Sequence, residues 1–246
     1  MRVPAVGSPV TTYWRLIDAT AARYQPAGPY AYHYARGKLQ RDPVYFSLLE
    51  QGLIPDQARV LDLGCGQGIL LALLATAGEF FHLRNRPDDW PRVPRGLRLR
   101  GIDVQPKAVR RARIALGAAA GIVQGDLSSA DFADSDVIFL LDVLHYLPPA
   151  AQEMVLAKAG QALLPNGILI LRVADPQSGM RTVLTRHSDR IASMLRGEVW
   201  GAYHLRPVAQ WISILESLGL QVQSMPMSQG TPFANVLLIA RRSGDQ

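Results

Sequence analysis

Short apolar runs alternate with helix-like stretches from residue 58 onward, and this alternation is typical of a parallel α/β fold. Seven runs have the length of strands and lie at 58–64, 97–104, 121–126, 135–143, 168–175, 220–225 and 233–240. The stretches with helical spacing lie at 69–77, 105–116, 148–164 and 207–218. The run at 135–143 is almost wholly apolar, as expected of a strand buried on both faces of a doubly wound, mostly parallel sheet.

Three segments fall outside this alternation. Residues 1–57 precede the first strand and are predicted to form an N-terminal helical cap, leaving 58–246 as the main domain. Residues 78–98 form a Pro-rich insertion that is longer than most loops between a helix and a strand, so it is either functional or an exposed decoration. Residues 175–206 form a third irregular segment, before the last helix, and the Pro165–Gly167 turn is expected to close the helix at 148–164.

The composition excludes several classes of protein. With 48% hydrophobic and 19% charged residues, the chain of 246 residues can bury a full core and is not intrinsically disordered. Cys65 is the only cysteine, so no disulfide forms within the chain, and the five His show no zinc-ligand spacing with it. No apolar run approaches the roughly 20 residues that cross a bilayer, and the N-terminus lacks the apolar stretch of a signal peptide. We therefore expect a soluble, cytoplasmic protein without a metal site.

The formal net charge of +6 raises the question of nucleic-acid binding. Ten of the 26 basic residues fall between Arg84 and Arg113, but Pro, Asp and Trp interrupt them and no long block of like charge forms. Such a spread is more typical of a solvated face than of a phosphate-binding track. An anionic small substrate or an acidic carrier protein would suit the same charge.

A glycine-rich loop lies where the first strand ends and the first helix begins. The run VLDLGCGQG at 60–68 places Gly64, Gly66 and Gly68 at this turn, where a ligand can approach main-chain N–H groups without meeting a Cβ. The spacing is G-x-G-x-G, whereas the dinucleotide fingerprint is G-x-G-x-x-G, and Ile69 stands where its third glycine would be.

Asp103 ends the second strand, where an acid can accept both ribose hydroxyls of an adenosine. It lies 35 residues beyond Gly68 instead of the usual ~20, and the insertion at 78–98 accounts for the excess. The alternative is that Asp103 only caps the helix that starts at Gln105. If it binds the cofactor, Asp103→Ala should abolish binding and leave the melting temperature nearly unchanged.

The motifs VLDLGCGQG, GIDV, GDL, LDVLHYL and LLPNGILIL occur in this order over about 59–172. In this combination the chain resembles the class I, Rossmann-like S-adenosylmethionine-dependent methyltransferases. The resemblance implies a seven-stranded sheet with helices on both faces and an antiparallel last strand. It also implies that S-adenosylmethionine lies across the carboxyl ends of strands one to four and leaves as S-adenosylhomocysteine.

The same resemblance assigns residues to the methionine part of the cofactor. Gly64 and Gly66 would approach it by their main chain, and Asp62 would help to orient it. Leu141 and Asp142, at the end of the fourth strand, would line its amino group.

For the adenosine part, Asp103 would hold the ribose and Val104 would pack on the adenine. Asp126 would bond the adenine amino group, with the main chain of Leu127 beside it.

Other candidates around the cofactor carry open alternatives. Arg36 or Lys38 could bind the cofactor carboxylate, or could belong to an exposed helix face. Cys65, between two glycines, fits a small side chain lining the cofactor loop better than a nucleophile, because no partner base is evident.

Methyl transfer requires an in-line approach of the nucleophile, so positioning supplies much of the catalysis. His145 follows the fourth strand, and its neutral imidazole could act as a general base; the alternative is a packing or cofactor-lining role.

Substrate contacts are expected from two places. Tyr32 and Tyr34, with their neighbours Tyr24, Tyr30 and His33, could form a flat-walled lid over an aromatic substrate, or could pack the cap onto the sheet. The family usually places substrate contacts in the segment that here contains Tyr203, His204 and Arg206, and ordinary loop decoration is the alternative.

The form DVLHYL after the fourth strand is similar to enzymes that methylate small molecules, and it lacks the Asn/Asp-Pro-Pro-aromatic run of amino-methylating nucleic-acid enzymes. The stretches at 34–43 and 226–238 are also similar to methyltransferases of bacterial aryl polyene pigment clusters, which implies an aryl acceptor, presented as a thioester on an acyl carrier protein. Three alternatives stay open: an RNA methyltransferase, a dinucleotide-binding oxidoreductase and a catalytically silent cofactor-binding domain. The acceptor atom and the oligomeric state do not follow from the sequence.

Overall fold

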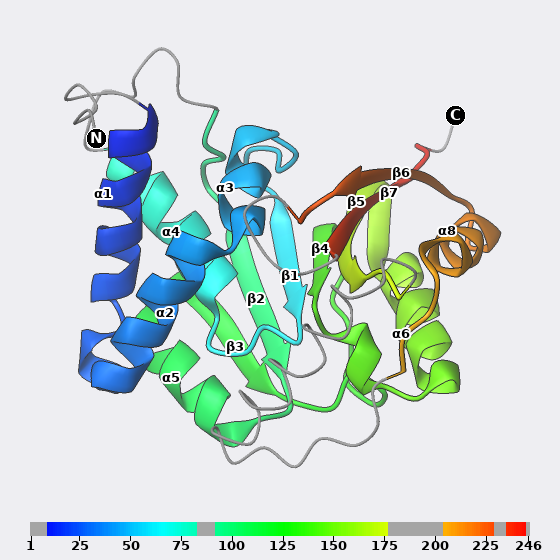
Figure 1. Cartoon of the computed structure of the whole chain (residues 1–246), viewed down its shortest axis with the longest axis horizontal. Helices are drawn as coiled ribbons and strands as arrows, with labels where there is room; N and C mark the ends of the chain where they lie inside the picture. The colour runs from blue at the N-terminus through cyan, green and yellow to red at the C-terminus, as the bar shows by residue number, and fades with distance from the viewer. Residues whose placement is uncertain (1–8, 83–91, 177–203, 229–234, 245–246) are drawn as a thin grey trace. The chain divides into compact units, whose positions relative to one another are not determined.

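The computed structural model describes residues 9–82, 92–176, 204–228 and 235–244 (Figure 1). The chain folds as two compact units, residues 1–126 and 127–246. Its seven strands follow the order β3-β2-β1-β4-β5-β7-β6, and β7 runs antiparallel to both of its neighbours. This mostly parallel sheet, with its antiparallel last strand, confirms the predicted fold class. The proposed division at residues 57 and 58 stays a prediction.

The first unit contains three parallel strands, β1 (Arg59–Leu63), β2 (Arg98–Asp103) and β3 (Ala120–Gln124). The helices α4 (Ile69–His82) and α5 (Pro106–Leu116) pack against β2 and against each other. The single turn η2 (Gly117–Ala119) leads into β3. Because the strands are parallel, the residues that follow β1 and β2 emerge at one edge of this part of the sheet.

The N-terminal cap is helical, as predicted. It consists of α1 (Pro9–Ala22), the turn η1 (Gln25–Ala27), α2 (Pro29–Arg41) and α3 (Pro43–Glu50). Proline at the first position starts α2 and α3, since that position needs no backbone N–H bond. In Figure 1 the blue α1 runs beside α4 and α2, and it is in contact with both.

The second unit is built on β4 (Ser135–Leu141) and β5 (Leu163–Ala174), which pair in parallel. β7 (Asn235–Arg242) pairs antiparallel with both β5 and β6 (Leu220–Pro226). The turn η3 (Leu144–Tyr146) and the helix α6 (Pro149–Ala162) lie between β4 and β5.

The helix α8 (Val208–Ser217) packs on β6 and β7, and α6 packs on β5 (Figure 1). The central residues of β4 and β5 are fully buried, as their apolar sequences require. Within the described residues no helix combines the length and the hydropathy needed to span a membrane.

Several predicted boundaries differ from the observed ones, and three of the differences affect the description of the fold. The helix expected to end at residue 77 continues to His82, so the insertion predicted from residue 78 begins later, and 83–91 lie outside the described residues. β4 ends at Leu141, because Asp142 takes the left-handed backbone conformation (φ 59°). The turn at 165–167 does not close α6: it lies inside β5, as an irregularity between the pairs Ser135–Leu163 and Val137–Ile168.

Candidate functional site

The glycine loop of the first unit adopts the conformation that only glycine takes without strain. Gly64, Gly66 and Gly68 have φ values of 73°, 55° and 72°. The backbone N–H groups of Gly64 and Cys65 both donate to the carbonyl of Ile102, at 2.8 and 3.1 Å. These bonds anchor the start of the loop to β2 and leave its tip to turn into α4.

Gly68 has a second reason to be glycine. A Cβ there would lie 2.8 Å from Cδ1 of Leu116 and 3.2 Å from Cβ of Ala112, both on α5. A Cβ on Gly66 would meet nothing within 4 Å. Glycine at position 68 lets α5 pack closely on the loop. At Gly66, in contrast, the space above the backbone is open.

Asp103 joins the loop to the next helix. One carboxylate oxygen accepts the N–H of Gly66 at 2.7 Å, and the other accepts the N–H of Gln105 at 2.8 Å. Asp103 therefore fixes the backbone just before α5, although the N-cap residue is Gln105 and no side chain caps this helix, and it also makes a bond to the glycine loop that the sequence did not suggest. The geometry leads us to predict, against the expectation from the sequence, that Asp103→Ala lowers the melting temperature, because two backbone N–H groups would lose their acceptor. Its bond to a ribose stays a prediction.

Asp62 is a buried acid in β1. Burial, and then the nearby charge of Asp103, raises the pKa of Asp62 to about 7. Within the described part of the chain its carboxyl group takes part in no hydrogen bond or ion pair. A buried acceptor without a resident cation suits a cationic ligand, and S-adenosylmethionine carries a sulfonium and an ammonium group. The residues present in this unit therefore fit the predicted cofactor.

Cys65 faces the interior. Burial, followed by the charges of Asp62 and Asp103, raises the pKa of its thiol well above the usual value. A Cβ on Gly101 of β2 would come within 2.7 Å of its sulfur. These facts support the interpretation of Cys65 as a tightly packed side chain, since a nucleophilic cysteine needs a lowered pKa.

Tyr24, which the sequence placed in a possible substrate lid, instead holds the glycine loop. Its fully buried hydroxyl donates to the backbone carbonyl of Gln67 at 2.9 Å. Its neighbour Arg23 donates to Thr76 of α4 at 2.9 Å. The N-terminal cap is therefore part of the structure that holds the glycine loop, and the tyrosine cluster was the available signal for it.

The cations predicted for the cofactor carboxylate have other partners. Nε of Arg36 lies 2.9 Å from Asp18 of α1, in an exposed pair. Nζ of Lys38 lies 2.9 Å from Asp42 at the end of the same helix. The geometry favours the helix-face alternative for both residues, and their role toward the cofactor stays a prediction.

The residues predicted to form an aromatic lid make two separate sets of contacts. Tyr34 stacks on Tyr30, with ring centroids 5.9 Å apart, and the guanidinium of Arg111 on α5 lies 4.5 Å from the Tyr30 ring. Tyr32 contacts His33 edge to face at 5.0 Å. The first of these groups places the cap against α5 and not, as the alternative interpretation had expected, against the sheet, and the lid stays a prediction.

Three residues assigned to the adenosine part differ in exposure. Val104 is 50% exposed at the end of β2, so it can offer an apolar surface to a ring. Asp126 is exposed, and Leu127 is buried. In the second unit, Nζ of Lys158 donates to the carbonyl of Leu127 at 3.1 Å and to that of Ala130 at 2.6 Å, which fixes this turn from α6.

At the end of β4, Asp142 forms an ion pair with Arg172 of β5. Nε of Arg172 donates to one carboxylate oxygen at 2.8 Å, and Nη2 donates to the other. Arg172 is only 3% exposed, whereas the side chain of Asp142 is 33% exposed, so the guanidinium is held out of water and the carboxylate only partly. Leu141 precedes it and is partly exposed. If Asp142 binds the amino group of the cofactor, as predicted, it must do so while Arg172 also binds its carboxylate.

His145 lies in η3 and lines a small cavity of about 10 Å³, room for about one water molecule at most, together with Leu144, Arg172, Val173, Ala174, Leu205, Arg206 and Trp211. Burial lowers the pKa of His145 to about 4, with Asp142 opposing the shift and Arg172 adding to it. The imidazole is therefore neutral at pH 7 and can accept a proton. A general base works best when its pKa lies near the operating pH, so this environment makes His145 a weak one.

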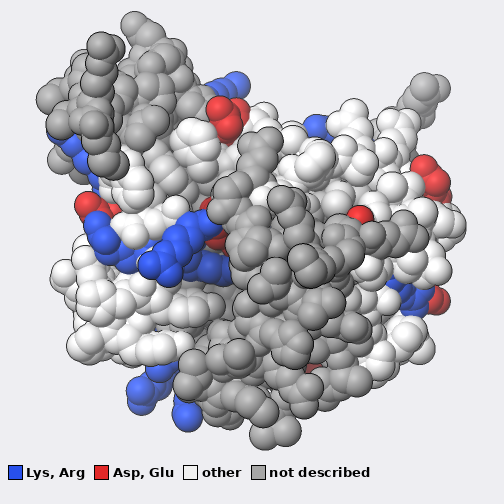
Figure 2. Space-filling model, viewed as in Figure 1, with Lys and Arg blue, Asp and Glu red and all other residues white. Residues whose placement is uncertain are grey.

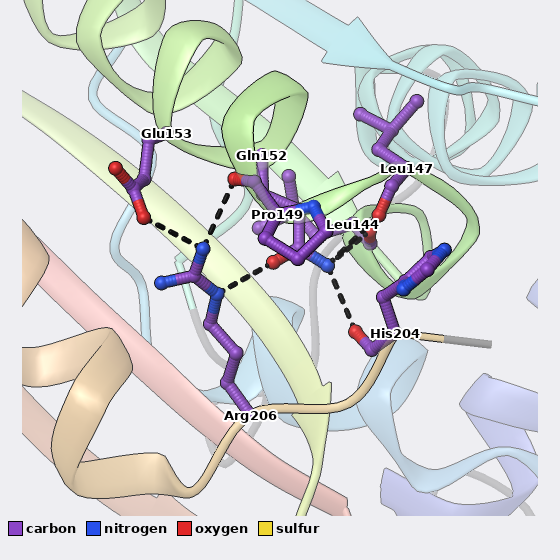
Figure 3. Close-up of polar contacts among 7 residues, drawn as sticks. All are labelled: Leu144, Leu147, Pro149, Gln152, Glu153, His204 and Arg206. Atoms are coloured by element: carbon purple, nitrogen blue, oxygen red, sulfur yellow. Dashed lines mark hydrogen bonds and ion pairs between the residues drawn. The ribbon is translucent and has the colours of Figure 1, made fainter.

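The structure brings His145 together with two other predicted residues. The backbone N–H of His204 donates to the carbonyl of His145 at 2.9 Å, and Arg206 lines the same cavity. Arg206 also donates to Gln152 and Glu153 of α6, at 2.7 and 2.6 Å (Figure 3). These internal bonds give Arg206 a structural role, and its contact with substrate stays a prediction. Tyr203 lies outside the described residues.

A mostly parallel sheet with an antiparallel β7, a left-handed glycine loop after β1 and an acid ending β2 together define a Rossmann-like methyltransferase fold. The chain belongs to the methyltransferase domain family, whose model matches residues 32–224.

Two solved structures share this fold. An O-methyltransferase family protein from Burkholderia thailandensis superposes with a TM-score of 0.60 at 22% identity, over 94% of this chain and 63% of that one. Magnesium protoporphyrin IX methyltransferase from Synechocystis PCC 6803, solved with S-adenosylhomocysteine, gives 0.58 at 20% identity and covers 96% of both chains.

Among curated proteins, a carboxy-S-adenosyl-L-methionine synthase from Chromohalobacter salexigens is 34% identical over 119 residues. The match covers 46% of this chain and 39% of that relative, so the chain spans well under two thirds of the relative's length.

Proposed function

We propose that this protein transfers the methyl group of S-adenosylmethionine to a small-molecule acceptor. The observation that carries the proposal is the pair of acids Asp62 and Asp103 beside the left-handed glycines of the β1–α4 loop. When bound, the cofactor supplies an electrophilic methyl carbon: the acceptor–carbon bond forms, the carbon–sulfur bond breaks and sulfur keeps the electron pair. The acceptor's proton, where it has one, leaves to solvent or to a base.

In this proposal, the chain's own residues bind the cofactor and orient it. Asp62 is the acceptor whose negative charge a cationic ligand would stabilise, and Asp103 fixes the loop through Gly66 while offering its remaining lone pairs to a ribose. Tyr24 holds the loop from the cap side. Such fixed geometry lowers the barrier of an in-line displacement chiefly by positioning, an effect worth up to ~7–11 kcal/mol.

The first test measures binding and transfer separately. Isothermal titration calorimetry with S-adenosylmethionine and S-adenosylhomocysteine should show binding to the wild type, a loss of at least tenfold in affinity for Asp62→Ala, and no change for the exposed Glu50→Gln. Methyl-labelled cofactor is then incubated with host lysate, and label is followed into small-molecule, protein and RNA fractions. Label in organic-soluble material supports the proposal, whereas label in RNA replaces it with an RNA methyltransferase.

For the acceptor, we propose an aromatic group presented as a thioester on an acidic acyl carrier protein. The likeness of 34–43 and 226–238 to aryl polyene methyltransferases suggests the aryl group. Figure 2 shows Lys and Arg side chains gathered over the α2 and α5 side of the first unit, a surface that suits an acidic carrier. Label on a small acidic protein that is released by thioester cleavage would support this acceptor, and label that resists such cleavage would contradict it.

A second candidate is suggested by the curated relative, which is named a carboxy-S-adenosyl-L-methionine synthase. In that case the protein would modify the cofactor instead of a separate acceptor. Mass spectrometry of the cofactor after incubation distinguishes the two: S-adenosylhomocysteine accumulates in methyl transfer, and a carboxylated cofactor accumulates in the alternative. Binding without either product would leave a cofactor-binding domain.

A further inference from the structure

The side chain of Gln152 is fully buried at the start of α6 and bonds to parts of the chain before and after that helix. Its amide nitrogen lies within hydrogen-bond distance of the carbonyls of Leu144, Leu147 and His204, at 3.0, 3.1 and 2.8 Å. Its amide oxygen accepts from Nε of Arg206 at 2.7 Å. Figure 3 shows these groups converging on the Gln152 amide from η3 and from the segment before α8.

Chemistry alone fixes the orientation of this amide. A guanidinium has only donors and a carbonyl has only acceptors, so the atom facing Arg206 must be oxygen and the atom facing the carbonyls must be nitrogen. Arg206 is itself held by the carbonyl of Pro149 at 3.0 Å and by Glu153 at 2.6 Å. No other uncharged side chain of this length could satisfy both sides, because it would need a donor and an acceptor on one terminal group.

The bonds converge on the turn that carries His145. The carbonyls of Leu144 and Leu147 accept from Gln152, and the carbonyl of His145 accepts from the backbone of His204, whose own carbonyl returns to Gln152. Three of the four carbonyls from 144 to 147 are thus fixed from outside the turn. A 3-10 turn of three residues has little internal bonding, so its position depends on such contacts.

We propose that Gln152 is a positioning residue that fixes the main chain of η3 and so sets the place of His145 at its cavity. It acts through the backbone and touches no reacting atom. The inference rests on the proposed methyl transfer for its catalytic consequence. The placement of His145 by the Gln152 amide does not depend on which reaction the site performs.

The kinetic test compares two isosteric changes on one helix. Gln152→Glu keeps the size of the side chain and its acceptor for Arg206, but it points carboxylate oxygen at three carbonyls. Gln161→Glu introduces the same charge at an exposed position of α6. With the acceptor found by label transfer, we expect kcat to fall about 10²-fold for Gln152→Glu, the loss that a displacement of about 1 Å causes, with KM for S-adenosylmethionine unchanged. Gln161→Glu should match the wild type.

A second readout does not depend on activity. Protein labelled at histidine is titrated by NMR, and the His145 resonance is identified by its loss in His145→Gln. Its pKa should lie far below the usual range in the wild type and in Gln161→Glu, and should rise by at least one pH unit in Gln152→Glu as the turn loosens. Asp142 and Arg172 act on His145 in all of these proteins, and because the new carboxylate of Gln152→Glu would itself raise the His145 pKa, the rise is assigned to the turn only if the uncharged Gln152→Met shows it as well.

Should Gln152→Glu fail to fold, Arg206→Met serves as the second variant, since it removes the donor that orients the amide and leaves Gln152 in place. A partial rise in the His145 pKa and a smaller fall in kcat are then expected. An unchanged titration and an unchanged kcat in either folded variant would overturn the proposal. If no methyl transfer is found with any acceptor, the proposed function fails, while the NMR titration still decides the role of Gln152.

Discussion

Replacing Asp62 by asparagine should stabilise the protein without ligand, and the gain should grow with pH. The carboxyl group is buried in β1, and Asp103 adds a second negative charge nearby, so the folded state holds the Asp62 proton up to about pH 7. The unfolded chain releases that proton near pH 3.8. Asparagine has nearly the same shape and never ionises, so Asp62→Asn removes this electrostatic cost and little else.

The sign and size follow from proton linkage. Between pH 3.8 and pH 7 the folded state binds more protons than the unfolded state, so this group makes stability fall as pH rises, and its effect is constant above pH 7. Each pH unit corresponds to about 1.4 kcal/mol, so the total cost of ionising Asp62 reaches about 4 kcal/mol. The stability difference between Asp62→Asn and the wild type should therefore grow by about 3 kcal/mol from pH 5 to pH 8.

Urea denaturation of both proteins at pH 5, 6, 7 and 8, without cofactor, measures this difference directly. The exposed Glu50→Gln, which also removes one carboxylate from the first unit, should show a nearly constant difference from the wild type. A difference between Asp62→Asn and the wild type that does not change with pH would refute the reasoning, because it would mean that Asp62 ionises as readily in the folded state as in the unfolded state.

Four further predictions concern the same groups. Binding of S-adenosylmethionine at pH 6 should release close to one proton in wild type and none in Asp62→Asn, as read from calorimetry in buffers of different ionisation enthalpy; equal release by both would contradict this. His145→Gln should remove a loss of about 3 kcal/mol that the wild type suffers as pH falls from 6.5 to 4, since the folded state binds the His145 proton less readily; urea denaturation at pH 4.5 and 7 checks the sign. Tyr24→Phe should cost about 1–3 kcal/mol by leaving the buried carbonyl of Gln67 without its donor, and a loss below 0.5 kcal/mol in urea would argue against it. Asp103→Ala should lower stability by about 2–4 kcal/mol in the same assay, and an unchanged midpoint would restore the ligand-only role.

The strands and the order of the motifs were predictable because parallel strands buried on both faces have nearly continuous apolar sequences, as 137–140 do. The boundaries of the helices and strands were harder to predict. Phe80 and Phe81 continue the apolar face of α4 beyond the stretch that the spacing marked, and no proline intervenes before residue 87. The turn at 165–167 carries the residues of a helix stop, yet the helix ends earlier and Asn166, with a φ of 62°, serves an irregularity in β5.

The acids at strand ends were predictable from their place in the chain, since the residues that follow parallel strands emerge at one edge of a sheet. The contacts that hold them were not. Tyr24 reaches Gln67 across 43 residues, and Gln152 meets Arg206 across 54. A single buried glutamine or tyrosine leaves no periodic signal, and a lone sequence offers no means of pairing residues so far apart.

Asp62 and Asp142, two of the acids in the sequence motifs, differ in whether each already has a cationic partner, and this decides how each could bind a cationic cofactor. Asp142 has a resident cation, because Arg172 holds both of its carboxylate oxygens, and a ligand ammonium would have to share or displace that guanidinium. Asp62 has no such partner within the described residues. Its pKa is raised because the buried carboxylate is unfavourable without a compensating cation. A ligand cation therefore gains more from Asp62, whose ionisation it stabilises, than from Asp142, whose charge is already balanced. On this ground we predict that the protein's main attraction for the positive charge of S-adenosylmethionine lies in β1, whereas the pair of Asp142 and Arg172 fixes the end of β4 beside η3.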